Sequence, residues 1–69
     1  MGDSATDGAY LFLGFNAAGE CPAMELIVCA DPASAIARAR HWLASHLTCI
    51  RVQVWKDDVL LEEIPPGRG

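Results

Sequence analysis

The feature that most constrains this chain is one helical segment, residues 31–47, with apolar runs of strand character on both sides. Asp31 is a favourable N-cap, because its side-chain oxygen can accept from an unpaired backbone N–H of the first turn. Pro32 fits the first helical position, where its missing N–H costs nothing. We expect the helix to end near His46, because the sequence after it changes to a period of two.

This helix is predicted to bury one side and to expose the other. Its apolar residues recur at helical spacing, which is typical of a helix that packs on a sheet. The centre of the apolar stripe is predicted at Ile36, Ala39 and Leu43, with Ala35, Trp42 and Leu47 at its edges. Arg38 and His41 fall on the opposite side, which we expect to face water.

Four apolar runs are predicted to be strands. They span residues 9–15, 23–30, 48–56 and 59–64. The first run is apolar at every position except Gly14, so it needs cover on both faces and belongs inside the sheet. The sequence therefore predicts an α+β fold, ββαββ, with a four-stranded antiparallel sheet in the order 2-1-3-4 and one helix packed on one face. The alternative order, with the third run beside the second, would leave the first run on an edge.

The chain is predicted to form a single domain at residues 9–64. Residues 1–8 are polar and without periodicity, and we expect a disordered tail there. Residues 65–69 are predicted to form a loose C-terminal tail. With 69 residues the chain has room for only one thin core, and chains this short often need a disulfide, a metal or a second subunit.

One helix covers only one face of a four-stranded sheet, so the other face is the predicted interaction surface. In the second run, Met24, Leu26 and Val28 are assigned to the helix side. The register of residues 9–15 toward the helix is left open. The candidate interface residues are Glu25, Ile27, Cys29, Arg51, Gln53 and Trp55. Tryptophan and arginine dominate binding hot spots, and the sequence predicts a homodimer, by sheet face or by sheet edge.

Charge and composition exclude several classes of partner. The formal net charge is −4, and the five basic residues are spread along the chain, which argues against nucleic acid and against an anionic membrane surface. The first residues are acidic and polar and do not resemble a signal peptide, so we expect a cytoplasmic protein with reduced thiols. Abundant Ala and the excess of Arg over Lys favour a bacterial source.

The sequence predicts no catalytic residue, no metal site and no cofactor. The three cysteines lack the spacing of metal ligands, and His41 and His46 lie about 140° apart on a helix. Cys21 is predicted to be a loop thiol with no base fixed beside it. Glu62 and Glu63 are adjacent, so they cannot serve as a spaced acid–base pair, and we interpret them as protection of a sheet edge.

Three segments carry a resemblance to known proteins. They are YLFLGFNAAGE, ADPASAIARARHWL and VQVWKDDVLLEEI, which together cover residues 9 to 64. The pattern is similar to a loose group of small, uncharacterised bacterial proteins with a β-β-α-β-β order, an Ala-rich helix and a V-x-V-W strand before a closing hairpin. The resemblance implies the same fold and carries no activity with it.

Two hypotheses about function remain at this stage. The first is a non-enzymatic protein–protein interaction module, homodimeric, whose further partner is unknown. The alternative is a small acidic phage or mobile-element inhibitor, similar in format to anti-CRISPR proteins, that binds a bacterial protein target. The acidic residues are scattered rather than arranged in a stripe, which weakens the alternative.

Overall fold

The computed structural model describes residues 8–65. The elements are β1 (Gly8–Phe15), β2 (Ala23–Cys29), α1 (Pro32–Ser45), β3 (Arg51–Lys56) and β4 (Val59–Ile64). The strands form one open sheet in the order β2-β1-β3-β4, with antiparallel neighbours throughout. The predicted ββαββ fold and strand order are confirmed. The predicted tails lie outside the described residues except for Gly8, which opens β1, and Pro65.

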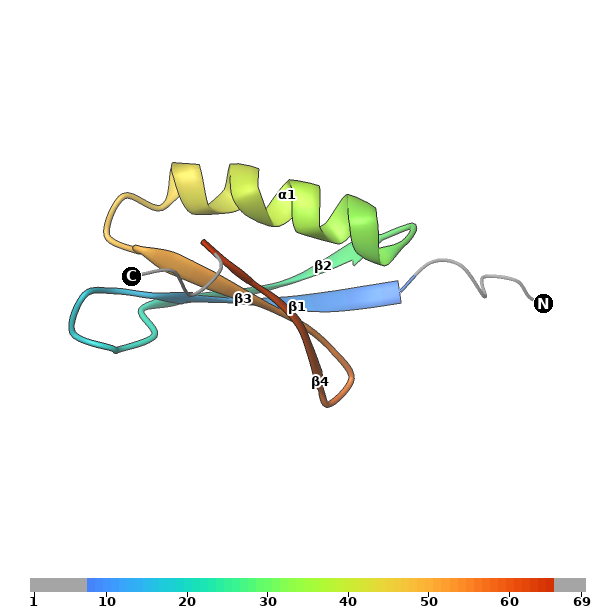
Figure 1. The fold of residues 1–69 in the computed structure, drawn as a ribbon, viewed down its shortest axis with the longest axis horizontal. Helices are drawn as coiled ribbons and strands as arrows, with labels where there is room; N and C mark the ends of the chain where they lie inside the picture. Colours follow the sequence, from blue (N-terminus) through green and yellow to red (C-terminus); the bar gives the residue numbers. More distant parts are fainter. Residues whose placement is uncertain (1–7, 66–69) are drawn as a thin grey trace.

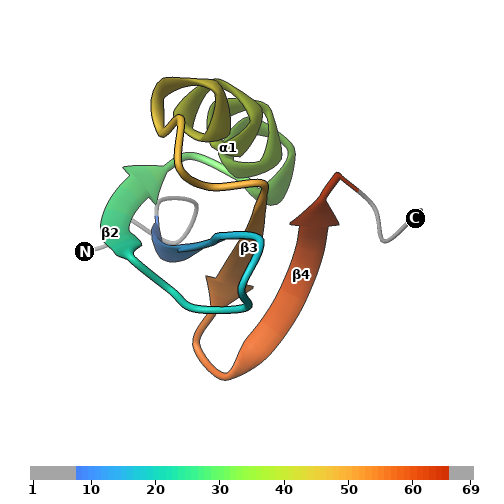
Figure 2. The same ribbon diagram turned by 90° about the vertical axis from the view of Figure 1, so that its left-hand side faces the viewer.

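The molecule has two layers. Helix α1 runs along one face of the twisted sheet, and no other described element covers the opposite face (Figures 1 and 2). The helix contacts all four strands, so it lies over the middle of the sheet rather than beyond an edge. The core is therefore confined to one side of the sheet.

The helix begins and ends where the sequence predicts. The Asp31 carboxylate accepts the backbone N–H of Ser34 at 2.7 Å, and Pro32 occupies the first turn. His46 is the C-cap, and its backbone N–H donates to the Leu43 carbonyl at 3.1 Å. These bonds satisfy groups that a helix end otherwise leaves unpaired.

The helix buries a side that is rotated about its axis relative to the predicted one. Ala35, Ala39 and Trp42 are buried, whereas Ile36 and Leu43 are half-buried at the flank. Leu47 is 92% exposed and lies after the helix, so its assignment to the stripe was wrong. The two alanines let the helix backbone approach the sheet closely, and Trp42 fills the space that remains.

Gly14 of β1 makes room for Trp42. A Cβ atom at Gly14 would lie 2.9 Å from Cζ3 of Trp42 and 2.8 Å from Sγ of Cys49, closer than such atoms pack. Gly14 therefore faces the helix, and the alternation of β1 places Phe12 and Tyr10 on the same side. Both are buried, and the Phe12 and Trp42 rings meet edge to face with centroids 5.7 Å apart.

The register of β1 against β2 then determines which side of β2 faces the helix. Direct partners in an antiparallel pair share a face. Phe12 pairs with Glu25 and Tyr10 with Ile27, so Glu25 and Ile27 lie on the helix side. Cys29 is buried in the same core. The predicted orientation of β2 was therefore wrong. The observed orientation is selected by the packing of Trp42 on Gly14, and the apolar alternation of β2 alone does not determine it.

Candidate functional site

The first candidate site is the open sheet face, the face that α1 leaves uncovered. It is built from alternate residues of all four strands, and cross-strand partners form rows across it. One row runs Leu26, Leu11, Trp55, Leu60, and the next runs Met24, Leu13, Gln53, Glu63. Val28 and Ala9 lie beyond the first row, and Phe15 and Arg51 lie beyond the second.

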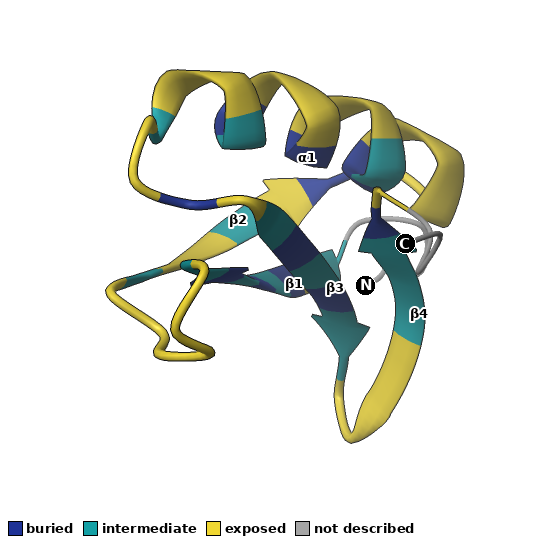
Figure 3. Ribbon diagram, turned by 60° about the vertical axis from the view of Figure 1, so that its left-hand side comes forward, coloured by how far each residue is buried: buried dark blue, intermediate teal, exposed yellow. Residues whose placement is uncertain are grey.

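Most of the open sheet face is apolar and accessible to water. The β2 side chains are the most exposed part: Met24 is 69% exposed and Leu26 and Val28 are each 66% exposed. Figure 3 shows β2 as a mainly exposed strand beside the buried and half-buried stretches of β1 and β3. Single exposed apolar residues are common, but a contiguous set across neighbouring strands marks an interaction surface.

The polar groups of the open sheet face gather over β3 and β4 and are already paired. Nε of Arg51 lies 2.8 Å from a carboxylate oxygen of Glu63, and the guanidinium is 4.9 Å from the centre of the Phe15 ring. The Trp55 indole N–H donates to the Gln53 side-chain oxygen at 3.0 Å. This corner is therefore electrically balanced and does not oppose the burial of the neighbouring apolar residues.

A β-bulge in β4 shapes the border of this face. The register between β3 and β4 shifts at Val54 and Trp55, so Trp55 pairs with Leu60 while Val54 pairs with Glu62. Leu61 is the extra residue, and it packs against the core. The bulge thus keeps Leu60 beside Trp55 on the open sheet face and turns Leu61 toward the helix side.

The structure divides the six predicted interface residues into two groups. Arg51, Gln53 and Trp55 lie together on the open sheet face, as predicted. The other three, Glu25, Ile27 and Cys29, lie on the helix side, and residues of β2 that were not predicted take their place. Those residues are Met24, Leu26 and Val28 of β2. The sequence signal for them is Gly14, which has no side chain and leaves room for Trp42, the largest side chain of the helix. It marks the face of β1 under the helix, and the pairing of β1 with β2 then turns these residues to the opposite face.

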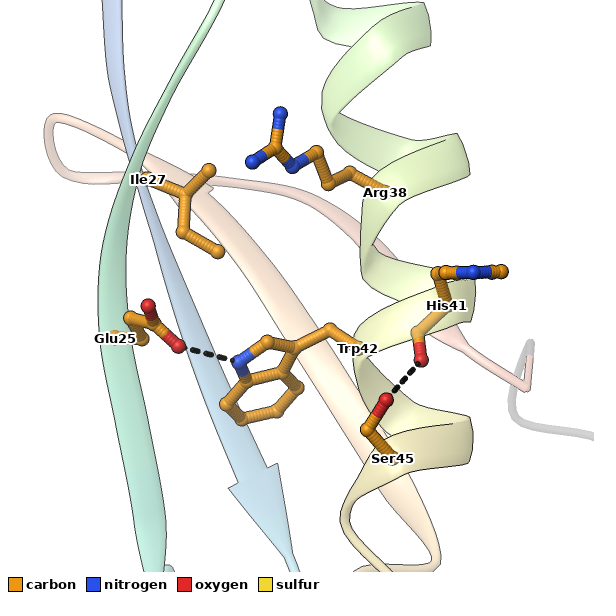
Figure 4. Close-up of a pocket in the computed structure, with 6 residues that line it drawn as sticks. All are labelled: Glu25, Ile27, Arg38, His41, Trp42 and Ser45. Carbon is orange, nitrogen blue, oxygen red and sulfur yellow. Dashed lines mark hydrogen bonds between the residues drawn. The ribbon is translucent and has the colours of Figure 1, made fainter.

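A second feature is a small open cleft of about 230 Å³ between α1 and β2. It is lined by Glu25, Ile27, Arg38, His41, Trp42 and Ser45 (Figure 4). The Trp42 indole N–H donates to the Glu25 carboxylate at 2.8 Å across the cleft. Small-molecule sites usually enclose about 300–1,000 Å³. This smaller cleft has room for a side chain of a neighbouring protein, and the edge strand β2 forms one of its walls.

Two titratable groups have shifted pKa values, and neither lies on the open sheet face. Burial in the core raises the pKa of Tyr10, with smaller contributions from the charges of Asp31 and Cys29. The hydrogen bond from the Ser34 backbone lowers the pKa of Asp31. Both shifts follow from the packing and capping of the fold.

Side chains that bind metals are not gathered in the described part of the chain. Among residues 8–65 no group of three or more His, Cys, Asp or Glu side chains is placed to hold a metal ion. Cys21, Cys29 and Cys49 are all free, and Cys21 alone is exposed. Helix α1, the one helix of this range, is too short and too polar to cross a membrane.

Comparisons with protein-family models, with curated proteins and with solved structures found no match for this chain. The resemblance to the group of small bacterial ββαββ proteins therefore stays a prediction. The open sheet face is the feature of this chain that most strongly suggests a function.

Proposed function

We propose that this protein is a non-enzymatic protein–protein interaction module that pairs with a second copy of itself through the open sheet face. The observation that carries the proposal is an apolar row that crosses the whole sheet on the side without a helix, exposed at Leu26 and Leu60 and half-buried at Leu11 and Trp55. The free energy gained by removing such a row from water drives association.

The charge of the open sheet face suits a second copy. The chain carries a formal charge of −4, which would make two copies repel if the charges met at the interface. On the open sheet face, however, the two charged side chains are Arg51 and Glu63, and they form an ion pair. The face therefore has no net charge, and pairing of two such faces brings no net charge together.

The size of the face predicts the strength of the pairing. Strands of six to eight residues at about 3.3 Å per residue, four abreast at about 4.8 Å, give a face of roughly 400 Å². Two copies then bury roughly 800 Å², which is below the range of about 1,200–2,000 Å² for stable specific interfaces and typical of weak, transient ones. We expect two sheets packed about 10 Å apart with a dissociation constant in the micromolar range.

The expected cytoplasmic location is part of this proposal. An association driven by exposed apolar side chains does not need disulfides, and the two buried thiols, Cys29 and Cys49, are free. Reduced thiols are the rule in the cytosol. We infer a protein that reaches a stable state by association rather than by cross-linking.

Light scattering after size-exclusion chromatography tests the proposal with Trp55→Glu. The wild type is expected to exceed the 7.4 kDa monomer at tens of micromolar. Trp55→Glu places a carboxylate in the middle of the apolar row and is expected to raise the dissociation constant at least about tenfold.

Leu47→Glu is the matched control. It adds the same charge at an apolar residue that is 92% exposed and lies outside the open sheet face, so it is expected to associate like the wild type. A wild type that stays monomeric at about 200 µM refutes the proposal, since that concentration is well above a micromolar constant. A Trp55→Glu variant that associates as strongly as Leu47→Glu also refutes it.

A further inference from the structure

The outer edge of β2 carries few of the features that normally protect a sheet edge. Within residues 8–65, β2 has β1 on one side and no neighbour on the other. Its seven residues, AMELIVC, pair with β1 in continuous register without a bulge. Natural edge strands are commonly short, bulged, or marked by Lys or Pro, because a regular free edge pairs with other strands. Strand β2 has no bulge, no Lys and no Pro within it; its one charge, Glu25, is held on the helix side by the Trp42 N–H, and Pro22 precedes its first residue.

The other edge of the same sheet shows the contrast. Strand β4 carries a bulge at Leu61, the adjacent charges Glu62 and Glu63, and Pro65 directly after its last residue. Each of these features opposes pairing with a further strand. The chain therefore protects the β4 edge more strongly than the β2 edge, where a regular strand of seven residues stays open to pairing.

We propose that β2 pairs edge to edge with β2 of a second copy, antiparallel and centred on Leu26, so that two sheets join into one of eight strands. Leu26 is the middle residue of the seven, and this register alone uses the whole strand. On the open sheet face it places Met24 opposite Val28 of the second copy, and Leu26 opposite its own equivalent. Apolar cross-strand pairs of this kind stabilise a sheet.

Charge complementarity on the helix side supports the same register. In it, Glu25 of the second copy lies opposite Ile27, and the Arg38 side chain extends from the helix toward Ile27 (Figure 4). The Glu25 carboxylate of each copy therefore comes beside the Arg38 guanidinium of the other. One Glu25 oxygen is held by the Trp42 N–H, which leaves the second oxygen for this pair. A register centred on Glu25 would instead place two carboxylates opposite each other.

The helix leaves the necessary space. Because α1 contacts all four strands, it lies over the sheet, and the free edge strand β2 forms one wall of the cleft while α1 forms the other. The side chains of an added strand are of the size that this cleft admits. Edge pairing therefore covers the cleft as well as the unpaired backbone groups of β2.

Edge pairing is independent of pairing through the open sheet face. The first extends the sheet in its own plane, and the second stacks two sheets about 10 Å apart. A chain that uses both surfaces assembles as four copies. A chain that has lost pairing through the open sheet face is expected to keep two.

Disulfide trapping tests the edge register in the Trp55→Glu background, with Cys21→Ser to remove the exposed thiol. At the centre of an antiparallel pair the two Cα atoms lie about 4.5–5.5 Å apart, which a disulfide spans. Leu26→Cys is therefore expected to form a cross-linked dimer under mild oxidation. Sheets stacked face to face hold equivalent Cα atoms about 10 Å apart, too far for this bond.

Met24→Cys and Val28→Cys in the same background fix the register. Each alone places its two introduced thiols about 13 Å apart, four residues along the pair, and is expected not to cross-link. A mixture of the two variants brings the thiol of Met24→Cys in one chain opposite the thiol of Val28→Cys in the other and is expected to cross-link. A Leu26→Cys chain that cross-links no faster than Met24→Cys alone overturns the proposal, as does a mixture that behaves like the single variants. A cooperative thermal transition of each reduced variant shows that it is folded.

Discussion

Gly14→Ala is the sharpest perturbation of the packing that orients this sheet. The added methyl group would lie 2.8 Å from Sγ of Cys49 and 2.9 Å and 3.0 Å from Cζ3 and Cη2 of Trp42. Carbon atoms pack best at about 3.5–4.0 Å. The separation from each of these three atoms, which belong to Cys49 and Trp42, must therefore grow by about half an ångström or more. The indole is held by Phe12 on one side and by its hydrogen bond to Glu25, which limits how far it can shift.

The expected cost follows from two opposing effects. Overpacking of a buried site usually costs about 1–3 kcal/mol. Replacement of glycine by alanine also restricts the unfolded chain, which returns about 0.4–1 kcal/mol. We therefore expect Gly14→Ala to lower the free energy of unfolding by about 1–2 kcal/mol, the difference of these two ranges near their centres.

Urea denaturation monitored by circular dichroism measures this cost. The matched experiment is a double-mutant cycle with Trp42→Phe, whose shorter ring withdraws from the added methyl group. We expect the double variant to be more stable than the sum of the single effects predicts, with a coupling energy of about 0.5–2 kcal/mol. A Gly14→Ala protein as stable as the wild type, with no coupling to Trp42, would refute the packing that orients β1 and β2.

Three further outcomes are expected. The pKa of Asp31 is lowered in the folded chain, so its ionised form stabilises the fold above the usual carboxyl pKa. This contribution is lost as the pH falls through about 4 and below. Asp31→Asn keeps the cap without titrating, so its urea midpoint should fall less than that of the wild type across pH 7, 5 and 3. Glu25→Ala leaves the Trp42 indole N–H without its partner, and thermal melts should show a loss of about 1–2 kcal/mol, most of it restored by Glu25→Gln. EDTA and reductant should leave the melting temperature unchanged, because the cysteines are free and the described residues hold no metal cluster.

The fold could be predicted because strong local signals agree with one another. The first strand is apolar on both faces, which requires an interior position and leads to the order 2-1-3-4. Asp31 and Pro32 mark the helix start by capping chemistry that depends only on nearby residues. Such features are decided within a few residues, so the sequence displays them directly.

The orientation of β2 could not be predicted from the strand itself. Met24, Leu26 and Val28 are its most apolar residues, and burial of apolar surface favours turning them inward. The observed orientation follows from a distant contact, because Trp42 rests on Gly14 and the β1–β2 register then brings Glu25 beneath the indole. The apolar alternation of one strand carries no information about the side chain that will lie above it.

The composition of the candidate site followed from this orientation. Arg51 and Trp55 were identified because the alternation of β3 is clear and Val52 and Val54 fill the core. The β2 half of the surface was assigned to the wrong residues. The open sheet face is consequently more apolar than predicted, since it carries methionine, leucine and valine in place of Glu25 and Cys29.

The central prediction is that the open sheet face becomes covered when the protein associates. Acrylamide quenching of tryptophan fluorescence reports this directly, because Trp42 is buried in the monomer and Trp55 lies on the open sheet face. Trp55→Phe, which retains only Trp42, gives the baseline. We expect quenching of the wild type to decrease as the protein concentration rises through the micromolar range and to approach this baseline. Quenching that remains constant between about 1 and 200 µM, a range that spans the expected dissociation constant, would contradict the proposal.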